Sequence, residues 1–557
     1  MDEKGHRERE HFFGAAKVIA SITALSRVFG LVRDMAITSL GADRATGAFV
    51  FAFQIPNLFR RLFGEGALSG AFVPVFTDTA EAEGFAKASR LLANALGLLA
   101  TFLVALMVLI HLGLLAWGLL WPGAWDRQLL LALTAVMVPF MVTICLLALG
   151  SAALNCRGHF AYPAAAPIIL NIFIILAATV VAPYWRGRVS TQLYIISASV
   201  TIAGAVQLVA VLLLLRAAGF GIRPRLRPVE AGIGPMLKLM APMLIGLGFL
   251  QVSPFFDNVI IWNLTATAQT PTINLFGLEL ARPLSEAAQM HVYAAQRLYQ
   301  LPMGVLATSL GVAVFPLLSR YVTRGDRAGL RDGLNRAVRL TLMEGLAAGT
   351  GLWMLAEPIM ALLFVRGRFT ASDAAASASV LQMYVLGMWA YCSYMIFSRA
   401  FFALKEPKTP LKVSCVLVVV NILLVALLVW VPGLRAGAFG LATSMTAAVN
   451  VVILASALRR RLGRIGGRRV LVSFVRTAVC CAAMAAAIAA IRWLLGPVAN
   501  WLTVVVCVPA GAAVFAASAW LLRAPELGEL VGALRRPPRG GPTPPGAPYN
   551  ESDANKV

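Results

Sequence analysis

The apolar positions of this chain fall into long runs separated by short polar or proline-containing stretches. About fourteen runs reach the roughly 20 residues that a helix needs to cross a membrane. They lie near residues 17–40, 47–76, 90–117, 128–152, 160–183, 192–215, 235–262, 286–318, 335–364, 375–403, 410–431, 437–457, 470–491 and 500–522. The alternating pattern of a membrane-spanning β-strand is absent from the sequence. The pattern therefore predicts an all-α polytopic membrane protein with about 14 transmembrane helices.

The composition agrees with a lipid environment. The chain has 557 residues, of which 59% are hydrophobic and 13% charged, whereas ordinary soluble domains are about 25% charged. Such a chain cannot cover its apolar surface with polar groups. A cleavable signal peptide is not expected, because residues 1–16 are charged and the following run is too long and too polar for a signal sequence.

The net charge of +23 is unevenly distributed between alternate connections. If the N-terminus is cytoplasmic, the even-numbered connections carry the arginine and lysine clusters, near 223–238, 320–331, 405–412 and 459–469. This asymmetry predicts a multi-pass protein of the cytoplasmic (inner) membrane with both termini cytoplasmic. The basic charge then serves topology and attraction to membrane lipids, and no nucleic-acid partner is expected.

Several motifs recur in order at a nearly constant separation. "GAFVPVF" (70–76) resembles "GVAVFPLL" (311–318), and each follows a helix start that contains a proline, Pro56 or Pro302, 246 positions apart. Asn171 and Asn421, each in an apolar run after a basic turn, are 250 positions apart. We expect two parallel lobes of six helices each around a central cavity, followed by two C-terminal helices.

These features divide the chain into successive parts. They are a cytoplasmic N-terminal segment (1–16), an N-lobe (17–216), a basic inter-lobe linker (217–234), a C-lobe (235–457), C-terminal helices 13 and 14 (458–522) and a disordered cytoplasmic tail (523–557). The tail contains the Pro- and Gly-rich stretch "PPRGGPTPPGAPY". Two-lobed repeat transporters place their substrate between the lobes and alternate access by rocking.

Charged residues inside the predicted spans are candidates for a functional site, because each costs about 2.5–3.5 kcal/mol at the membrane centre. The basic ones outnumber the acidic ones. They are Arg27, Arg33, Arg60, Arg61 and Arg297, against Asp34, Glu65 and Asp257. A surplus of arginine favours an anionic guest, and the planar guanidinium matches phosphate oxygens. A cation or drug exporter is expected to show an acidic or aromatic surplus instead.

Each candidate has a structural alternative. Arg27 and Arg33 either contact a substrate, pair with Asp34, or extend toward the membrane interface. Arg61 pairs with Glu65 at helical i, i+4 spacing.

Two polar stripes at helical spacing contain the remaining candidates. One places Asn57 beside Arg60 and Arg61, and the other places Gln296 and Gln300 around Arg297. Arg297 has no acidic neighbour within one turn, which favours a functional role. Two roles stay open for Asp257: a contact between helices, or a coupling site for an ion or a proton.

Other chemistry has little support in the sequence. The seven cysteines show no CxxC spacing and the five histidines are scattered, so neither a metal site nor a cofactor is expected. The longest external connection, 263–285, offers only Glu279 as an acidic residue, which argues against a metal-dependent glycosyltransferase. Catalytic residues are therefore not expected, and the protein is not predicted to be an enzyme. Coupling to membrane potential, H⁺ or Na⁺ stays open.

Four stretches together resemble the MurJ/MviN lipid II flippase family. They are "SRVFGLVRD" (26–34), "IPNLFRRLFGEGALSGAFVPVF" (55–76), "LPMGVLATSLGVAVFPLLS" (301–319) and "LLFVRGRFTASDA" (362–374). The resemblance covers residues 15–525 and implies fourteen helices in the multidrug/oligosaccharidyl-lipid/polysaccharide exporter superfamily. It also implies that the final two helices form a groove for a polyprenyl tail.

The resemblance implies an activity and a site. Members of the family move lipid II, the undecaprenyl-diphosphate-linked peptidoglycan precursor, from the inner to the outer leaflet for cell-wall synthesis. Their cavity arginines match Arg27, Arg33, Arg60 and Arg297, and their acidic positions match Asp34, Glu65 and Asp257. The chain departs from the family pattern at four positions, where charged residues are replaced by Gly47, Gln54, Gln296 and Gln300.

The sequence thus predicts a flippase for lipid II or a similar polyprenyl-diphosphate glycolipid, working by alternating access. Membrane lipids and proteins of cell-wall synthesis are the other expected partners. The alternatives are an exporter of another polyprenyl-linked polysaccharide precursor and a cation-coupled drug exporter of the same superfamily.

Overall fold

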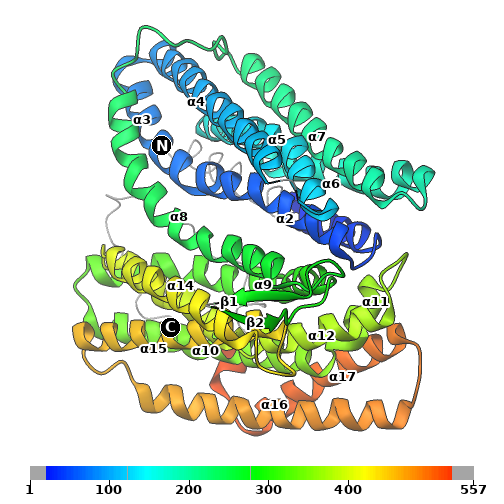
Figure 1. The fold of residues 1–557 in the computed structure, drawn as a ribbon. Helices are drawn as coiled ribbons and strands as arrows, with labels where there is room; N and C mark the ends of the chain where they lie inside the picture. The colour runs from blue at the N-terminus through cyan, green and yellow to red at the C-terminus, as the bar shows by residue number, and fades with distance from the viewer. Residues whose placement is uncertain (1–20, 122, 276, 530–557) are drawn as a thin grey trace.

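The computed structural model describes residues 21–121, 123–275 and 277–529, and Figure 1 shows their course. The predicted cytoplasmic segment 1–16 and the tail beyond residue 529 lie outside the described residues.

The first half of the described chain begins with a helix over residues 21–38. The next span is continuous but changes character along its length, because a π-helix lies between two α-helices. The elements of this half are α2 (Arg44–Phe59), the π-helix η1 (Arg60–Ala67), α3 (Leu68–Glu83), α4 (Phe85–Leu120), α5 (Trp125–Cys156), α6 (Ala161–Leu176), η2 (Ala177–Val181), η3 (Ala182–Trp185) and α7 (Val189–Ala217).

The second half contains two sharply bent spans and one small sheet. The chain bends by 71° between α10 and α11 and by 42° between α12 and α13. The elements are α8 (Ile233–Leu264), β1 (Thr272–Leu275), β2 (Leu278–Ala281), α9 (Ala288–Thr323), α10 (Arg327–Met354), α11 (Ala356–Phe364), α12 (Ala371–Val385), α13 (Met388–Ala403), α14 (Lys408–Leu428), α15 (Gly437–Leu462), α16 (Gly467–Leu495) and α17 (Asn500–Leu521).

The predicted polytopic helical fold is confirmed, and each of the fourteen predicted runs coincides with a helical span of the described chain. Among the described residues, eight helices are long and apolar enough to cross a membrane alone, and ten are when each bent pair counts as one span. The four other spans are residues 21–38, α2 with η1 and α3, α8, and α9. These are the spans that carry the candidate charges.

Helices of the two halves pack in the same order. In the first half α5 packs against α2 and α7, and in the second half α12 and α13 pack against α9 and α15. Figure 1 shows the two halves lying side by side, with α8 running along their boundary and α16 on the outer face of the second half.

Asn171 and Asn421 make equivalent contacts in the two halves. The Asn171 Nδ2 donates to the Ser26 carbonyl oxygen at 3.4 Å, which ties α6 to the first helix. The Asn421 Oδ1 accepts from the Ser253 hydroxyl at 3.1 Å, which ties α14 to α8. The two asparagines predicted to mark the repeat therefore hold the fifth helix of each half to its first helix.

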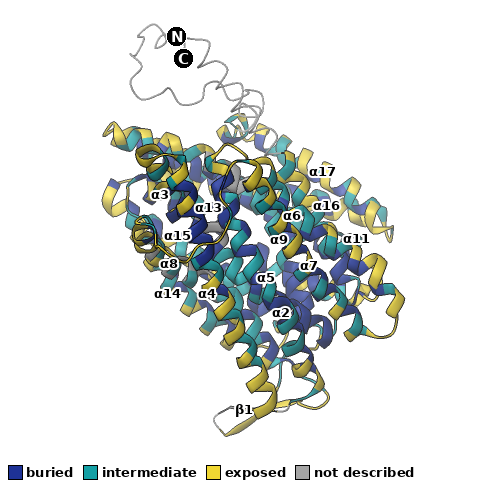
Figure 2. Cartoon of the chain, turned by 90° about the horizontal axis from the view of Figure 1, so that it is seen from above, coloured by how far each residue is buried: buried dark blue, intermediate teal, exposed yellow. Residues whose placement is uncertain are grey.

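The two ends of the molecule are named after the segments that lie there. The hairpin end carries β1 and β2, which pair antiparallel and project from the body in Figure 2. The linker end carries residues 218–232, which join α7 to α8. Between the ends, the outward faces of helices such as α4 expose Leu109, Leu112 and Leu115, as expected for contact with lipid.

The hairpin was not predicted from the sequence. Its signal is short: Thr272 and Ile273 have high β-propensity, and a glycine stands at the turn, Gly277, whose φ is +88°. Arg282 closes its base, since the Nη1 donates to the Thr265 carbonyl oxygen at 3.2 Å.

The predicted disorder from residue 523 onward is wrong for its first part. Residues 525–529 are helical, and the buried Glu526 pairs with the Arg339 Nη1 of α10 at 3.1 Å. The Ser473 hydroxyl of α16 also donates to Glu526 at 2.8 Å. A carboxylate bound by two helices orders this segment, and composition alone does not reveal such a contact.

Asn94, a buried side chain of α4, bonds two backbone groups of the linker. The Asn94 Nδ2 donates to the Arg225 carbonyl oxygen at 2.9 Å, and its Oδ1 accepts from the Glu230 backbone N–H at 3.1 Å. Nearby, a Cβ at Gly97 would lie 2.5 Å from the Arg225 carbonyl oxygen, so only glycine permits this approach.

We predict that Asn94→Leu lowers the thermal stability of the purified protein. The change keeps the side-chain volume but leaves two backbone groups of the linker without partners, each worth about 1–3 kcal/mol when buried. Asn263→Leu is the matched control, because Asn263 is exposed and bonds only to Val259 of its own helix. Equal unfolding temperatures for the two variants would contradict this role of Asn94.

Candidate functional site

Asp34 is the point where candidate residues from both halves meet. Its Oδ1 accepts from the Arg33 Nε at 3.0 Å and Nη2 at 2.7 Å, and from the Tyr293 hydroxyl of α9 at 2.6 Å. Asp34 is buried, and Arg33 is largely so. The Arg33 charge is therefore compensated inside the protein by a carboxylate that is also bonded to the other half.

The remaining contact of Arg33 orients its guanidinium. The Arg33 Nη1 donates to the Asn171 Oδ1 of α6 at 3.0 Å. Since Asn171 is itself bonded to the first helix, the fork of Arg33 is held by two helices of the first half. Of the alternatives for Arg33, pairing with Asp34 is present in the structure, and contact with a substrate stays a prediction.

Arg297 lies on the other side of Tyr293. Its Cζ is 5.0 Å from the centroid of the Tyr293 ring, within the range of a cation–π interaction. The buried Arg297 Nε has no hydrogen-bond partner among the described residues. Arg33, Asp34, Tyr293 and Arg297 therefore form one cluster across the two halves, called the charge cluster below.

The glutamines beside Arg297 face different surroundings. The Gln296 Nε2 donates to the Tyr384 hydroxyl of α12 at 3.0 Å. Tyr384 stacks on Tyr299 with the ring centroids 4.8 Å apart. Gln296 therefore connects α9 to α12 within the second half, while Gln300 is half-buried one turn further along α9.

Arg27 contacts the second half at a separate point. A Cβ at Gly304 of α9 would lie 2.8 Å from the Arg27 Nη1. Arg27 itself is exposed, in contrast to Arg33. The absence of a side chain at Gly304 lets the guanidinium of Arg27 lie against α9. This contact is separate from the charge cluster of Arg33, Asp34, Tyr293 and Arg297.

Arg60 and Arg61 begin the π-helix η1 and are half-buried. The Arg60 Nε donates to the Asn57 Oδ1 at 3.2 Å, and Asn57 donates to the Phe53 carbonyl oxygen. π-Helical turns often occur at functional sites, and this one changes the i, i+4 geometry assumed for Arg61 and Glu65. The side chain of Glu65 lies outside the described residues.

Arg33 and Arg60 line a pocket inside the first half. It has a volume of about 430 Å³ and lies between the first helix, α2 with η1, α5, α6 and α7. The polar part of its lining is completed by amide and hydroxyl side chains, namely Ser26, Asn57, Ser151, Asn155, Asn171 and Gln207. Arg27 and Arg297 are not among the lining residues. The four predicted substrate-binding arginines are therefore divided between this pocket and the boundary of the halves.

Asp257 is buried in α8, and its Oδ1 has no hydrogen-bond partner among the described residues. The next residue, Asn258, accepts a hydrogen bond from the Gln289 Nε2 of α9. Asp257 interacts electrostatically with Tyr299 and Tyr384, and Arg297 also interacts with Tyr299. The aspartate is thus a few side chains from the charge cluster without forming an ion pair among the described residues.

The two halves are joined at the hairpin end by Arg44. Its Nε pairs with the Asp126 Oδ2 of α5 at 2.8 Å, and its Nη1 donates to the Trp262 carbonyl oxygen of α8 at 3.0 Å. The Arg44 Cζ also lies 3.5 Å from the centroid of the Trp262 ring. One side chain therefore binds the first half and the second half at once.

A second contact at this end uses the loop after α11. The Arg368 backbone N–H donates to the Ser39 carbonyl oxygen at 2.9 Å, and the Arg368 side chain donates to the Leu40 carbonyl oxygen. A Cβ at Gly367, whose φ is +60°, would lie 2.2 Å from the Ser39 carbonyl oxygen. The "VRGR" part of the fourth stretch resembling the family thus closes the hairpin end.

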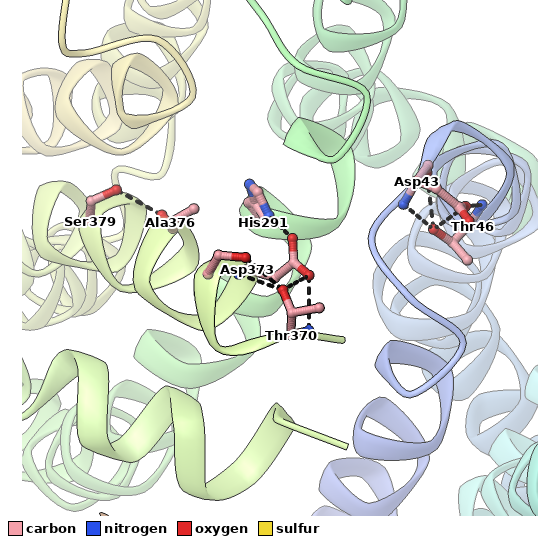
Figure 3. A network of polar contacts seen from close by, with 8 residues as sticks. Asp43, Thr46, His291, Thr370, Asp373, Ala376 and Ser379 are labelled. Carbon is pink, nitrogen blue, oxygen red and sulfur yellow. Dashed lines mark hydrogen bonds and ion pairs between the residues drawn. The ribbon is translucent and has the colours of Figure 1, made fainter. Parts of the chain in front are cut away.

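The same stretch also fixes α12 against α9, as Figure 3 shows. Thr370 and Asp373 form a capping box at the start of α12, and the Asp373 Oδ1 lies 3.0 Å from the His291 Nε2 of α9. Asp43 and Thr46 form an equivalent capping box at the start of α2, in the first half. These carboxylates stabilise helix starts and are not free to bind a cation.

Gly47 allows α2 and α9 to approach closely. A Cβ at Gly47 would lie 3.1 Å from the Gln289 Cβ, and all residues from Arg44 to Phe53 are buried. The departure from the family pattern at Gly47 therefore lies in the contact between the halves, on the hairpin-end side of the charge cluster. We call the contacts of Arg44, Gly47 and Arg368 the hairpin-end closure.

Sequence reasoning did not assign Arg44, Asp126, Trp262 or Gln207 to a site. Arg44 and Trp262 stand near the ends of predicted spans, where interfacial residues are common. Their roles depend on the packing of α2, α5 and α8, which no local pattern encodes. The bond of Tyr293 to Asp34 was not predicted either.

The comparisons with known proteins agree on one family. The profile of the family described as "Lipid II flippase MurJ" matches residues 36–507. A probable lipid II flippase MurJ of Vibrio cholerae is 30% identical over 500 residues, covering 87% of this chain and 90% of the relative. One of Rhizobium meliloti is 32% identical over 495 residues, covering 86% and 87%.

Solved structures show the same fold. A lipid II flippase MurJ in an inward closed conformation has a TM-score of 0.73 and 21% identity, covering 92% of this chain and 99% of that structure. An inward-facing multidrug resistance transporter of the MATE family and MOP superfamily has a TM-score of 0.63 and 14% identity, covering 81% and 98%. The predicted family is confirmed: this chain belongs to the lipid II flippase MurJ family, a family of multi-pass membrane transporters.

Proposed function

We propose that this chain moves lipid II from the inner to the outer leaflet of the cytoplasmic membrane for cell-wall synthesis. The observation that carries the proposal is the pocket lined by Arg33 and Arg60 within the membrane-spanning part of the first half. Arginines at this depth are costly unless they are compensated, and their planar forks suit the oxygens of a diphosphate. The names of the relatives supply the identity of the lipid.

The orientation follows from the basic residues. Arg225, Arg324, Lys408 and Arg460 all lie at the linker end, with the other arginine and lysine clusters. Positively charged connections stay in the cytoplasm. The linker end and both termini are therefore cytoplasmic, and the hairpin-end closure lies outside.

Transport then requires no bond to be broken. The diphosphate binds the arginines while the hairpin-end closure holds the halves together. The polyprenyl tail stays in the lipid. An anion beside Arg33 competes with Asp34 for the same guanidinium. With Arg33 drawn toward the anion, Asp34 is a buried carboxylate with less compensation, which is costly away from water. Separation of the halves at the hairpin end brings water to Asp34, so anion binding favours that separation.

Either an ion or proton that binds Asp257, or the membrane potential, drives the motion of the halves. A buried carboxylate near tyrosine hydroxyls, without an ion pair among the described residues, is suited to exchange H⁺ or to bind Na⁺. The proposal needs no metal cofactor. Lipid II and membrane lipids are the partners, and proteins of cell-wall synthesis are the expected protein partners.

We predict that Arg33→Ala and Arg297→Ala each reduce lipid II translocation at least tenfold, because each removes a charge-assisted contact in a desolvated site. Arg27→Ala and Arg60→Ala are expected to act in the same direction. The measurement is the accessibility of lipid II in the outer leaflet of cells in which this chain is the only flippase supplied.

Arg33→Lys and Arg186→Ala complete the experiment. The lysine keeps the charge that Asp34 needs but loses the fork, so a loss of transport at normal protein level separates binding from folding. Arg186 is exposed on the outer side, and its replacement should change nothing. Full transport by the alanine variants of the charge cluster would refute the site. If the chain instead moves a different polyprenyl-linked precursor, or exports ethidium, one of the alternative transporter functions is favoured.

We predict that a disulfide across the hairpin-end closure stops transport reversibly. Gly47→Cys with Gln289→Cys places two Cβ atoms 3.1 Å apart. This is a few tenths of an ångström below the roughly 3.5–4.5 Å of a disulfide, so a small outward shift of α9 allows the bond to form. Oxidation should abolish translocation, and reduction should restore it, because the halves cannot separate while joined. The single-cysteine variants are the controls, in a chain whose partly exposed Cys156 and Cys415 are changed to Ser. Undiminished transport by a chain proven to be crosslinked would exclude the rocking motion.

A further inference from the structure

A second polar pocket lies at the hairpin end of the second half. It has a volume of about 500 Å³ and is lined by the end of α10, the start of α11, the end of α16 and the start of α17. Because the chain bends by 71° between α10 and α11, the start of α11 faces the loop that follows α16. Figure 1 shows α16 on the side of the second half that faces away from the first half, so this pocket is separate from the arginines of the proposed transport site.

Exposed tryptophans mark the level of this pocket in the membrane. Trp493 lines the pocket and is 82% exposed, and Trp501 on the next helix is 57% exposed. Tryptophan collects where the lipid headgroups meet the hydrocarbon. Ile488 and Met484, which lie further along α16 toward the membrane centre, are buried among apolar side chains. The pocket therefore faces the headgroup layer.

The two charged side chains of the pocket are not paired with each other. Glu357 and Arg492 both line it, and both are exposed. The Arg492 Nη1 donates to the Met354 carbonyl oxygen at 2.9 Å, which holds the guanidinium against the end of α10. The Glu357 carboxylate has no hydrogen bond or ion pair among the described residues. A cation and an anion thus stand in one pocket, and both are accessible to a guest.

Two polar side chains of α17 add hydrogen-bond acceptors to the pocket. Thr503 is only 8% exposed, yet its hydroxyl has no hydrogen-bond partner among the described residues. This hydroxyl oxygen is still accessible, in contrast to the enclosed hydroxyls of Ser197 and Ser377. The exposed side chain of Asn500 also makes no hydrogen bond within the described chain. Together with Glu357, these residues present three groups that accept hydrogen bonds.

We infer that this pocket binds the headgroup of a phospholipid that carries a phosphate ester and a primary ammonium, as phosphatidylethanolamine does. The Arg492 guanidinium binds the phosphate oxygens. The three N–H donors of the ammonium are matched by the acceptors of Glu357, Asn500 and Thr503. A choline headgroup has the same charge but no N–H, so these acceptors favour the primary amine. The inference goes beyond the proposed function and takes from it only the orientation, which makes this leaflet the outer one.

The test measures which lipid the purified full chain retains from an equal mixture of dioleoyl phosphatidylethanolamine and dioleoyl phosphatidylcholine in detergent, by native mass spectrometry. The unaltered chain should bind the ethanolamine lipid about tenfold more tightly, as one charge-assisted hydrogen bond allows. In Glu357→Gln this preference should disappear, with binding of the choline lipid unchanged. Arg492→Gln should weaken both lipids equally, because both carry the phosphate.

Matched controls come from the same end of the molecule. Glu279→Gln removes an exposed carboxylate outside the pocket, and Arg186→Gln removes an exposed guanidinium outside it. Both variants should retain lipids as the unaltered chain does. Thermal unfolding verifies that each variant is folded. Thr503→Val keeps the side-chain shape without the hydroxyl and should lower the preference about threefold, which tests the pocket independently of Glu357.

Three results would overturn the inference. The first is equal retention of the two lipids by the unaltered chain, and the second is a preference that survives in Glu357→Gln. The third is displacement of the lipid by an equal concentration of soluble glycerophosphoethanolamine, which would assign the pocket to a soluble ligand of the same headgroup chemistry. Translocation of lipid II does not enter this readout, so a failure of the proposed function is recognised separately.

Discussion

The carboxylate of Asp34 is the constraint on which the rest of the structure depends. An arginine within a membrane must be compensated, and here a single oxygen of Asp34 accepts from Arg33 in its own half and from Tyr293 in the other. Compensation of the charge and contact between the halves are therefore the same interaction. Any anion that takes over part of Arg33 also changes the balance that holds the halves together.

The hairpin-end closure and the pocket have different chemistry, which suits their roles. The closure uses the side chain of Arg44, shared between Asp126 and Trp262, together with backbone and side-chain contacts of Arg368 to Ser39 and Leu40. Such contacts are few and reversible. The pocket instead contains arginines held in place by amides, Arg33 by Asn171 and Arg60 by Asn57. Binding within the first half and release of the outer contact are thereby linked through α9.

Hydrophobic periodicity was sufficient to predict the helical spans, because lipid imposes a length and a polarity on each one. Charges inside those spans identified Arg33, Asp34, Arg60 and Arg297, since a buried charge stands out in an apolar run. The contacts that these side chains make could not be predicted from the sequence. The bond of Tyr293 to Asp34 and the dual contact of Arg44 both form between helices that are distant in sequence. The ordered residues 525–529 and the β-hairpin were missed for the same reason, because contacts such as those of Glu526 and Arg282 stabilise them.

The distance between the halves at the hairpin end tests most directly whether anion binding separates them. Spin labels at Arg188→Cys and Glu279→Cys, both exposed there, report it by pulsed electron resonance in membranes, with Cys156 and Cys415 replaced by Ser. Without substrate, a single short distance is predicted, and added lipid II should populate a longer one. A distribution that lipid II leaves unchanged, in protein that still transports it, would contradict the coupling of anion binding to separation of the halves.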